Sequence, residues 1–405
     1  MHDEDRRTAG FKQKTRVEAA RTAFHGEITP LSRTERVPVR QADERVLATG
    51  IDADRPIPHY ARAAMDGYAL RATDTHNASE RSPVRLTVGE QPGTGQATRV
   101  HTGSVLPDGA DAVIKVEETD QRDGDIDVFS PVASGTNVGP VGEDIEAGQQ
   151  LYDEGTQLRP SDLGLVKGTG YDDVAVYERP RVSVIPTGEE LVQTDPEPGE
   201  IVETNGQTVA QYVERWGGVA TDREIVTDDL DTLRAAISRD TDHDIVVTTG
   251  GSSVGERDLL PEVVDGLGDV IVHGVALKPG HPVALGVVDG TPVLNLPGYP
   301  VACIVTAVQF LRPALKRAGH MPVRGPPTTT ARLTRKITSE PGTRSYARVT
   351  LDETDEGSTA TPVRSGGAGV LSSVALADGW VVVPESTEGY AEGETVTVEH
   401  WEWSR

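Results

Sequence analysis

The chain of 405 residues contains a single cysteine, Cys303. One cysteine excludes an intrachain disulfide and any metal site built from cysteine ligands. Cys303 lies within the apolar run from Val301 to Val308, and a free cysteine among apolar neighbours usually behaves as a small hydrophobic residue. We therefore expect Cys303 to be buried in a core rather than to act as a nucleophile.

Long hydrophobic runs are also absent. The sequence has no stretch of about 18 apolar residues, the length from which a membrane-spanning helix is built. The N-terminal residues from Met1 to Arg7 lack the apolar core of a secretory signal. We also find no internal repeat and no extended low-complexity segment. These absences predict a cytoplasmic protein that has no membrane attachment.

Basic residues are scarce, with 39 Lys and Arg against 64 Asp and Glu, which gives a formal net charge of -25. A surface this acidic repels the phosphates of nucleic acid, so nucleic acid is excluded as a partner. The same acidity suggests a halophilic protein, because high salt screens the self-repulsion. An anionic substrate must then bind in a local positive pocket, and only seven residues of the chain are lysines.

The N-terminal part combines helical and β patterns. Residues 12–25 and 42–47 have helical composition, whereas residues 51–144 hold short β runs interrupted by Gly, Pro and Asp. We predict an N-terminal helical and linker domain made of residues 1–50 and 145–178. The β-rich segment is then a domain inserted into it.

The central part alternates short apolar runs with amphipathic stretches, a pattern typical of a doubly wound parallel α/β sheet. The predicted elements are strands at 182–185, 224–226 and 245–247 and a helix at 206–216. A further helix begins at a cap provided by Asp228 or Asp229. From this pattern we predict a central α/β domain over residues 179–324.

The C-terminal part follows a boundary at Pro326 and Pro327. Short runs such as Trp380 to Val383 and Thr395 to Val398 read as strands of a small β domain. We predict a barrel-like β domain over residues 325–405. The expected fold class is therefore multidomain, with a central doubly wound α/β domain, a β-rich N-terminal region and a small C-terminal β domain.

The predicted strand at 245–247 runs into a glycine-rich loop. Such a loop can cradle an oxyanion, because glycines let the backbone approach a phosphate and successive N–H groups attract negative charge. The candidate ligands in the loop are Gly250, Gly251, Ser252, Ser253 and Gly255. Asp258 adds a carboxylate suited to a hard cation. Taken alone, the loop fits a plain tight turn equally well.

Two further turns follow apolar runs. They are Leu277-Lys278-Pro279-Gly280-His281-Pro282 and Asn295-Leu296-Pro297-Gly298-Tyr299-Pro300. Ligands of open α/β sheets bind beyond the carboxyl ends of the strands, so the spacing predicts that the three turns converge on one polyanion site. Lys278 is informative because lysine is rare here. The alternative is a pair of proline-stiffened turns with a solvated lysine.

These turns and their flanks resemble the central domain of the molybdopterin molybdenumtransferases, the family that includes the E-domain of gephyrin. Further motifs of this chain resemble the family in the same order. They are Ala64-Met65-Asp66-Gly67-Tyr68-Ala69, His101-Thr102-Gly103-Ser104, Pro107 to Val113, Gly142-Glu143-Asp144-Ile145 and Pro186-Thr187-Gly188-Glu189-Glu190-Leu191. Motifs spread over so much of the chain are not explained by coincidence.

The resemblance implies an enzyme of molybdenum cofactor biosynthesis. Such an enzyme inserts molybdate into adenylylated molybdopterin and releases AMP with the help of Mg²⁺. The implied metal ligands are Asp228 and Asp258, and Lys278 would contact phosphate or molybdate as a point charge. Glu190 is implied as a base or metal-site carboxylate, although it also fits a solvated face. Asp228 fits a helix cap as well.

The resemblance also assigns substrate-binding residues and an assembly. The substrate-binding candidates are Gly250, Gly251, Ser252, Ser253, Gly255, Gly280, His281, Pro297, Gly298, Pro300, Arg344 and Ser373. Asp66 and Thr102 lie in β-rich sequence far from the sheet, so they reach its crevice through domain closure or a second subunit. Family members are homodimers, which implies that the neighbouring subunit completes each site. A molybdopterin adenylyltransferase would supply the substrate.

The sequence departs from the family pattern at several positions. The usual Lys-Pro-Gly-Lys ends here in His281, so anion affinity can depend on pH. The usual Asn-Pro-Val-Ser is Tyr299-Pro300-Val301-Ala302, and the usual Gly-Arg is Gly342-Thr343, with Arg344 or Arg348 as the substitute. These changes leave open whether the inserted oxyanion is molybdate or tungstate.

Three alternatives stay open at this stage. A molybdopterin adenylyltransferase would share the central domain, but the motif around Asp66 and the additional N-terminal and C-terminal regions argue against it. A non-catalytic scaffold is disfavoured because no receptor-binding extension is evident. A paralogue that binds pterin or oxyanion without turnover is kept open by His281 and Ala302.

Overall fold

The computed structural model describes residues 14–250, 259–355, 357–363 and 369–403. Residue contacts divide the chain into two compact units, one of residues 36–176 and one of residues 1–35 and 177–405. The predicted N-terminal domain differs from this division at residues 14–35, which belong with the α/β sheet. None of the helices in the described ranges is long and apolar enough to cross a membrane.

The unit of residues 36–176 begins with a small core around α3 (Pro160–Gly168). Strands β1 (Thr34–Pro38) and β12 (Asp173–Tyr177) pair beside it. The helix predicted at 42–47 is wrong, because only the 3-10 turn η1 (Val39–Gln41) forms there. Val46 and Leu47 are instead extended: both are buried, Leu47 in this core, and both form bridges with neighbouring segments.

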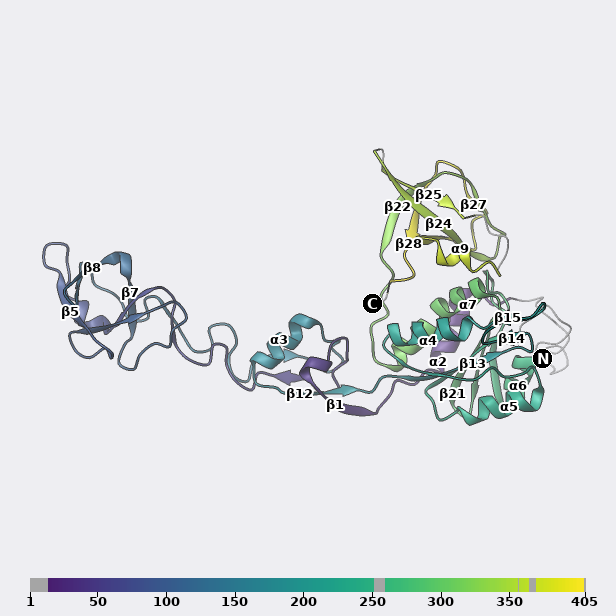
Figure 1. Ribbon diagram of the computed structural model, residues 1–405, viewed down its shortest axis with the longest axis horizontal. Coiled ribbons are helices and arrows are strands. Elements are labelled where there is room, and N and C mark those ends of the chain that lie inside the picture. The colour runs from purple at the N-terminus through teal and green to yellow at the C-terminus, as the bar shows by residue number, and fades with distance from the viewer. Residues whose placement is uncertain (1–13, 251–258, 356, 364–368, 404–405) are drawn as a thin grey trace. The chain divides into compact units, whose positions relative to one another are not determined.

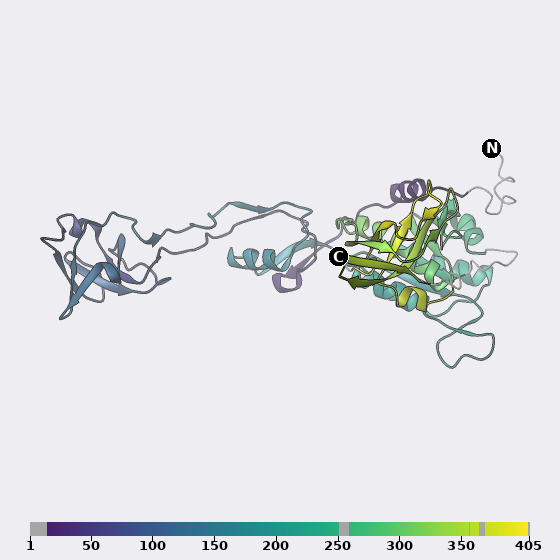
Figure 2. The ribbon, with the colours of Figure 1, turned by 90° about the horizontal axis from the view of Figure 1, so that it is seen from above.

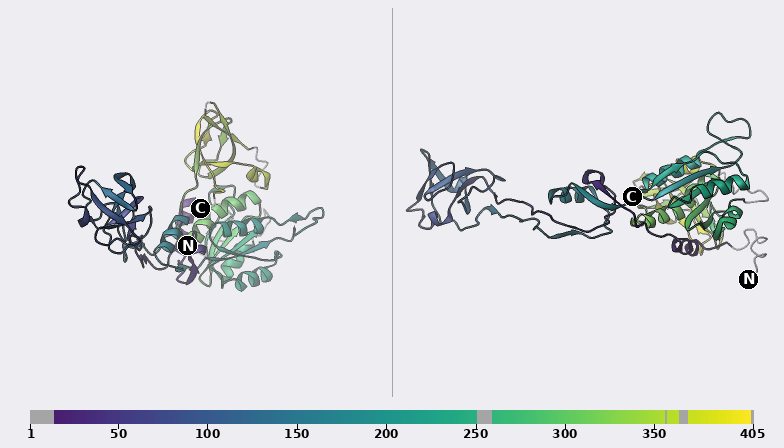
Figure 3. Two further views of the ribbon diagram at one scale, coloured as in Figure 1. Left: turned by 60° about the vertical axis from the view of Figure 1, so that its left-hand side comes forward. Right: turned by 90° about the horizontal axis from the view of Figure 1, so that it is seen from below.

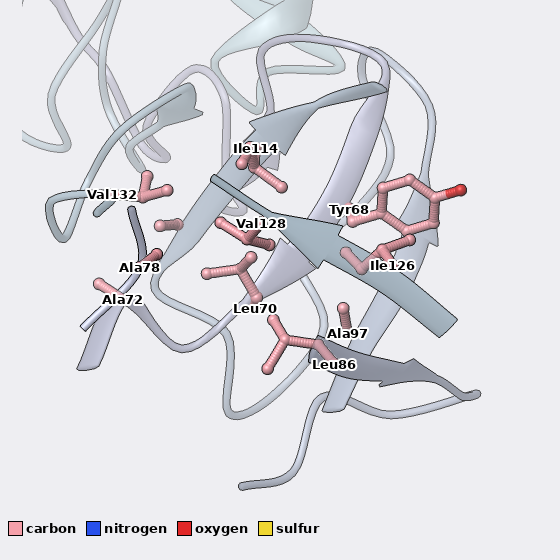
Figure 4. Close-up of a cluster of buried hydrophobic side chains, with 11 residues drawn as sticks. Tyr68, Leu70, Ala72, Ala78, Leu86, Ala97, Ile114, Ile126, Val128 and Val132 are labelled. Carbon is pink, nitrogen blue, oxygen red and sulfur yellow. The ribbon is translucent and has the colours of Figure 1, made fainter. Parts of the chain in front are cut away.

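The remainder of this unit is a six-stranded sheet, which confirms the predicted β-rich region. Its strands, in the order β7-β4-β6-β5-β9-β8, are β7 (Ala112–Lys115), β4 (Gly67–Leu70), β6 (Gln96–Val100), β5 (Val84–Val88), β9 (Asp125–Val128) and β8 (Thr119–Arg122). Figure 4 shows the apolar side chains of these strands gathered in one core, with Leu70 and Ile126 among its fully buried members. Two short strand pairs flank the sheet in the chain, each with one strand before it and one after it. They are β2 (Ile51–Asp52) with β11 (Gln150–Tyr152) and β3 (Arg62–Ala63) with β10 (Val138–Gly139).

The central sheet of the other unit has six strands in the order β16-β13-β17-β21-β20-β18. They are β16 (Val219–Asp222), β13 (Arg181–Thr187), β17 (Ile245–Gly250), β21 (Thr291–Leu296), β20 (Ala284–Val288) and β18 (Gly268–His273). The first four are parallel, and β20 and β18 are antiparallel to their neighbours. The predicted strand at 224–226 is wrong: β16 lies earlier, and Val226 makes only an isolated bridge to Thr187.

Helices cover both faces of this sheet, which confirms the doubly wound α/β domain (Figure 1). Helices α5 (Leu230–Arg239) and α6 (Leu259–Leu267) share one core with the sheet. Helices α4 (Asn205–Arg215) and α7 (Pro300–Thr306) pack together on the other face. Helix α7 continues through a π turn, η4 (Ala307–Leu311), into α8 (Arg312–Ala318). Cys303 is buried in α7, as predicted.

The C-terminal strands form a closed barrel, because β24 pairs with both β25 and β26. The barrel strands are β22 (Thr328–Leu333), β24 (Arg344–Thr354), β25 (Gly357–Pro362), β26 (Gly379–Val383) and β28 (Thr395–Glu399), with β23 (Ile337–Thr338) paired to β27 (Gly389–Tyr390) and one short helix, α9 (Ser372–Ala375). Strand β19 (Leu277–Lys278) leaves the α/β domain and pairs in parallel with β24. The barrel is thereby attached at the Lys278 turn.

Two peripheral elements complete the second unit. Helix α2 (Val17–Gly26) lies beside the barrel, in purple next to yellow in Figure 2, and Glu18 pairs there with Arg344 at 2.7 Å. Strands β14 (Leu191–Val192) and β15 (Ile201–Val202) form an arm that projects from the α/β domain (Figure 3, left). Ile201 on this arm is 57% exposed.

A buried charge cluster stabilises the α/β domain. Asp240 is fully buried and accepts hydrogen bonds from Ser183 at 2.7 Å, Arg223 at 2.6 Å and Arg239 at 2.8 Å. Burial alone would raise the pKa of Asp240, but the hydrogen bonds from Arg239, Ser183 and Arg223 outweigh it and lower the pKa to about 2.

Asp240→Asn is expected to lower the free energy of unfolding by about 3 kcal/mol, because it leaves buried donors without their anion. The folded-state pKa lies below the usual value of about 3.9, so the carboxylate stabilises above that pH and loses its effect as the pH falls towards 2. Urea unfolding at pH 7 and pH 3 should show a smaller difference between wild type and variant at pH 3. Asp242→Asn, at an exposed side chain, is the matched control; an equal loss in both variants would contradict this account.

Candidate functional site

The carboxyl ends of β13, β17 and β21 lie close together, and Gly250 and Gly298 are at the point of closest approach. Gly250 has a φ of +135°, and a Cβ on it would lie 1.9 Å from the carbonyl oxygen of Thr187 at the end of β13. A Cβ on Gly298, which follows β21, would lie 3.3 Å from the Cα of Gly250. Only glycine permits the approach at Gly250, whereas a Cβ on Gly298 would be crowded. The predicted convergence of these two turns is therefore present, and it includes the end of β13.

Two buried hydroxyls lie at these strand ends. The Oγ1 atoms of Thr187 and Thr249 are buried and have no hydrogen-bond partner in the part of the chain that the structure describes. Both residues are 1% exposed. Buried hydroxyls without partners are uncommon in folded proteins, and they are suited to an acceptor-rich ligand such as a phosphate. Neither hydroxyl was a predicted site residue.

The Lys278 turn packs against helix α7. Gly280 has a φ of +113°, and a Cβ there would lie 2.5 Å from Cγ2 of Thr306 and 3.4 Å from the carbonyl oxygen of Ala302. Because α7 begins at Pro300 of the Gly298 turn, this contact connects the two turns. The Lys278 and Gly298 turns thus border the same end of the sheet as Gly250, and Pro297 is buried.

The side chain of Lys278 is exposed and forms an ion pair with Glu340 of the barrel at 2.9 Å. The same pairing lowers the pKa of Glu340. His281 lies at the far end of the turn, and its partial burial together with the nearby ammonium groups of Lys14 and Lys278 lowers its pKa. The imidazole is therefore mostly neutral at pH 7. The family pattern has a lysine at this position.

The predicted carboxylates lie near the end of β13. Gly188 donates its backbone N–H to the carbonyl of Val226, which places the half-buried Asp228 two residues beyond that contact. Asp229, rather than Asp228, caps α5 by accepting a hydrogen bond from the N–H of Thr232 at 2.9 Å. Asp228 is thus not the N-cap of α5. Glu190 is exposed at the base of the β14–β15 arm.

Two polar residues at the start of α4 were missed by the sequence reasoning. Asn205 donates to the carbonyl of Gly298 at 2.6 Å and so holds the turn after β21. Glu203 accepts a hydrogen bond from the N–H of Gly206 at 2.6 Å. A signal existed, because an acidic residue three positions before Gly206 and an Asn at the predicted helix start are typical of a helix N-terminus.

The C-terminal candidates lie in different surroundings. Arg344 is engaged by Glu18 at 2.7 Å and Glu385 at 3.2 Å, which leaves it little freedom to bind a substrate. Ser373 is 2% exposed and donates to the carbonyl of Val370 at 2.7 Å. Arg348 is 9% exposed, and its buried Nε has no acceptor among the described residues. Of the two arginines, Arg348 is therefore the better candidate for an anion contact.

Asp66 and Thr102 form a polar pair on the other unit. Thr102 donates to Oδ1 of Asp66 from its backbone N–H at 2.7 Å and from its hydroxyl at 2.8 Å, and these bonds lower the pKa of Asp66. His101 lies 3.7 Å from the second carboxylate oxygen. The pair borders an open hollow of about 660 Å³ lined by Met65, Asp66, Thr102, Lys115, Glu117 and Glu118. The structure thus brings these two predicted residues together.

Several predicted residues lie outside the described ranges. They are Gly251, Ser252, Ser253, Gly255 and Asp258. Within the described ranges, no group of three or more His, Cys, Asp or Glu side chains is gathered as a metal site. Mg²⁺, however, is typically held by one or two carboxylates together with phosphate oxygens and waters. A half-buried Asp228 beside the strand ends fits that kind of site.

Comparison with known proteins identifies the family. The molybdopterin molybdenumtransferase of Bacillus subtilis is 33% identical over 399 residues, which cover 92% of this chain and 92% of that protein. A putative molybdopterin biosynthesis protein of Methanocaldococcus jannaschii is 34% identical over 379 residues, covering 90% of this chain and 92% of that protein. The chain belongs to the MoeA family.

Three MoeA-related regions account for most of the sequence. Residues 15–170 match the MoeA N-terminal region (domains I and II), residues 183–317 match a probable molybdopterin binding domain, and residues 330–401 match the MoeA C-terminal region (domain IV). The crystal structure of a molybdopterin biosynthesis MoeA protein from Pyrococcus horikoshii has a TM-score of 0.83 at 34% identity, covering 96% of this chain and all of that one. The predicted resemblance is confirmed.

Proposed function

We propose that this chain acts in molybdenum cofactor biosynthesis as a molybdopterin molybdenumtransferase, which inserts molybdate into adenylylated molybdopterin and releases AMP. The observation that carries the proposal is the contact of Gly250 with Thr187 and Gly298 at one end of the sheet, beside the Lys278 turn. Membership in the MoeA family gives this arrangement its chemical meaning. Regions matched on both sides of the central domain favour this activity over that of an adenylyltransferase.

In this proposal, the strand ends hold the phosphate groups of the substrate. Backbone N–H groups at the Gly250 and Gly298 turns and the buried hydroxyls of Thr187 and Thr249 are suited to bind phosphate oxygens. Lys278 supplies a point charge at the rim, where it exchanges its ion pair with Glu340 for the oxyanion. Residues of the loop beyond Gly250, among them Ser252 and Ser253, are proposed as further donors.

We propose Asp228, with Asp258, as the carboxylates that hold Mg²⁺. When bound, the ion would supply Lewis-acid stabilisation of the negative charge that develops on the phosphate groups. Asp228 offers a half-buried carboxylate beside the strand ends, and the cap of helix α5 is Asp229. Glu190 is exposed just after the end of β13. We propose that it accepts a proton or assists in holding the ion.

We further propose that the protein is a homodimer whose sites are completed by Asp66 and Thr102 of the neighbouring subunit. The polar pair borders an open hollow on a unit of its own, which is consistent with contact to a ligand held elsewhere. A cytoplasmic location and adaptation to high salt belong to the same proposal, the latter because of the net charge of -25.

Subunit mixing tests the shared site. Asp66→Asn and Lys278→Ala are each expected to be inactive, yet a mixture that exchanges subunits should regain about a quarter of the wild-type rate of AMP release, since half of the dimers then carry one intact site. Size-exclusion chromatography with light scattering checks that the mixture is dimeric. A mixture as inactive as its two components would show that each site is built from one chain.

The insertion activity itself is tested with purified protein in high salt, Mg²⁺ and adenylylated molybdopterin. Molybdate or tungstate is added, and AMP release is measured together with the metal retained on the pterin. Molybdate and tungstate differ little in size and charge, so both must be tried. The oxyanion whose metal is retained on the pterin is the substrate. Binding of the pterin without AMP release under both conditions would favour a scaffold or carrier instead.

A further inference from the structure

The N-terminal segment runs along the Lys278 turn. Thr15 forms a parallel bridge with Val275, donating to the carbonyl of Gly274 at 3.0 Å and accepting from the N–H of Ala276 at 2.8 Å. These residues lead directly into β19, which ends at Lys278. The bridge therefore places Lys14 beside a turn from which it is separated by more than half of the chain.

The position of this segment is fixed by helix α2. Val17, at the first position of the helix, is fully buried, and Glu18 forms an ion pair with Arg344 of the barrel. Because α2 starts three residues after Lys14, the backbone that follows Lys14 is fixed by the bridge at Thr15 and by the helix. Figure 2 shows α2 next to the barrel strands that carry this contact.

Four titratable side chains meet at this turn. Burial, together with the ammonium groups of Lys14 and Lys278, lowers the pKa of His281. The hydrogen bond from Lys278, with a smaller contribution from Lys14, lowers the pKa of Glu340. Lys14 is exposed, as are Lys278 and Glu340. Two of the seven lysines in a chain of net charge -25 thus lie near the same carboxylate, which pairs with Lys278. An anion approaching this protein meets its most favourable local potential where such basic groups gather.

We propose that Lys14 is a second cationic contact for the oxyanion that Lys278 binds, and that Glu340 pairs with Lys278 until the oxyanion displaces it. The inference rests on the proposed function and names a residue for that same site. The ligand chemistry is a tetrahedral oxyanion, either the molybdate or a phosphate of adenylylated molybdopterin. An exposed ion pair such as that between Lys278 and Glu340 is weak and screened by salt, so a doubly charged ligand can replace it.

The test compares Lys14→Ala, Lys14→Arg and Glu340→Gln with a matched control, Lys336→Ala, at an exposed lysine of the barrel domain. AMP release is measured while molybdate and adenylylated molybdopterin are varied in turn. Lys14→Ala should raise the KM for one of them about five- to tenfold with little change in kcat, because a charge-assisted contact is lost from the bound state. The affected substrate shows whether molybdate or phosphate is the anion held.

The remaining variants distinguish a direct contact from a structural role. Lys14→Arg should restore most of the affinity, Glu340→Gln should lower the same KM by removing the competing carboxylate, and Lys336→Ala should match the wild type. An unchanged KM for both substrates in Lys14→Ala, with a wild-type protein that releases AMP, would overturn this inference and leave the proposed function intact. A wild-type protein that releases no AMP with either oxyanion would overturn both.

Discussion

Gly250→Ala is expected to destabilise the protein by about 3 kcal/mol and to lower the rate of AMP release at least about 100-fold. The new Cβ would lie 1.9 Å from the carbonyl oxygen of Thr187, at a φ of +135° that L side chains rarely adopt. Since the obstacle is backbone, the ends of β13 and β17 must separate. That movement displaces the proposed phosphate-binding N–H groups, and a shift of about 1 Å is enough for a loss of this size.

The control for Gly250→Ala is Gly290→Ala. Gly290 also has a positive φ, +81°, but no atom lies within 4 Å of the position of its Cβ. It should lose only the backbone term, about 1 kcal/mol, and keep normal activity. Thermal unfolding and AMP release are measured for both variants. If Gly250→Ala is as active as Gly290→Ala, the approach of the strand ends has no bearing on catalysis.

Asp228→Asn is expected to lower AMP release about 100-fold while leaving the melting temperature nearly unchanged. The substitution keeps the size of the side chain and removes the charge proposed to hold Mg²⁺. The loss should be partly offset by raising the Mg²⁺ concentration, because a weakened site binds more of the ion at higher concentration. The rate is therefore measured over a range of Mg²⁺ concentrations.

The adjacent residue provides the matched control for Asp228. Asp229→Ala removes the cap of α5, so it should lower the melting temperature by about 2–4 °C and leave AMP release unchanged. Neighbouring aspartates thus have separate expected roles, one in activity and one in stability. A decrease in activity at Asp229 with none at Asp228 would reverse this assignment.

The sequence predicted the parts of the site that depend on strand order. Parallel strands end at one edge of a sheet, so glycine-rich turns after successive strands were expected to meet, and Gly250 and Gly298 do so. The barrel and the helix at α4 were also predictable, because their apolar periods are clear. The sequence did not decide which of Asp228 and Asp229 caps α5, since either aspartate is a good cap.

Other features depend on contacts that local patterns do not encode. Lys14 reaches the Lys278 turn through a backbone bridge between segments far apart in the chain. Val46 and Leu47 are extended because both are buried and bridged to segments distant in sequence. This tertiary context overrides the helical composition of residues 42–47. The ion pairs of Arg344 with Glu18 and Glu385 likewise required the folded arrangement of α2 and the barrel.

The central claim is that this chain couples oxyanion insertion to AMP release at the ends of β13, β17 and β21. The most direct test is a single-turnover experiment in which excess protein is loaded with adenylylated molybdopterin and Mg²⁺, and molybdate or tungstate is then added. We predict that AMP is released only after the oxyanion is added, in an amount equal to the metal retained on the pterin, and that Gly250→Ala slows the release at least about 100-fold. Stable binding of the adenylylated pterin, with no AMP released after either oxyanion, would contradict the account.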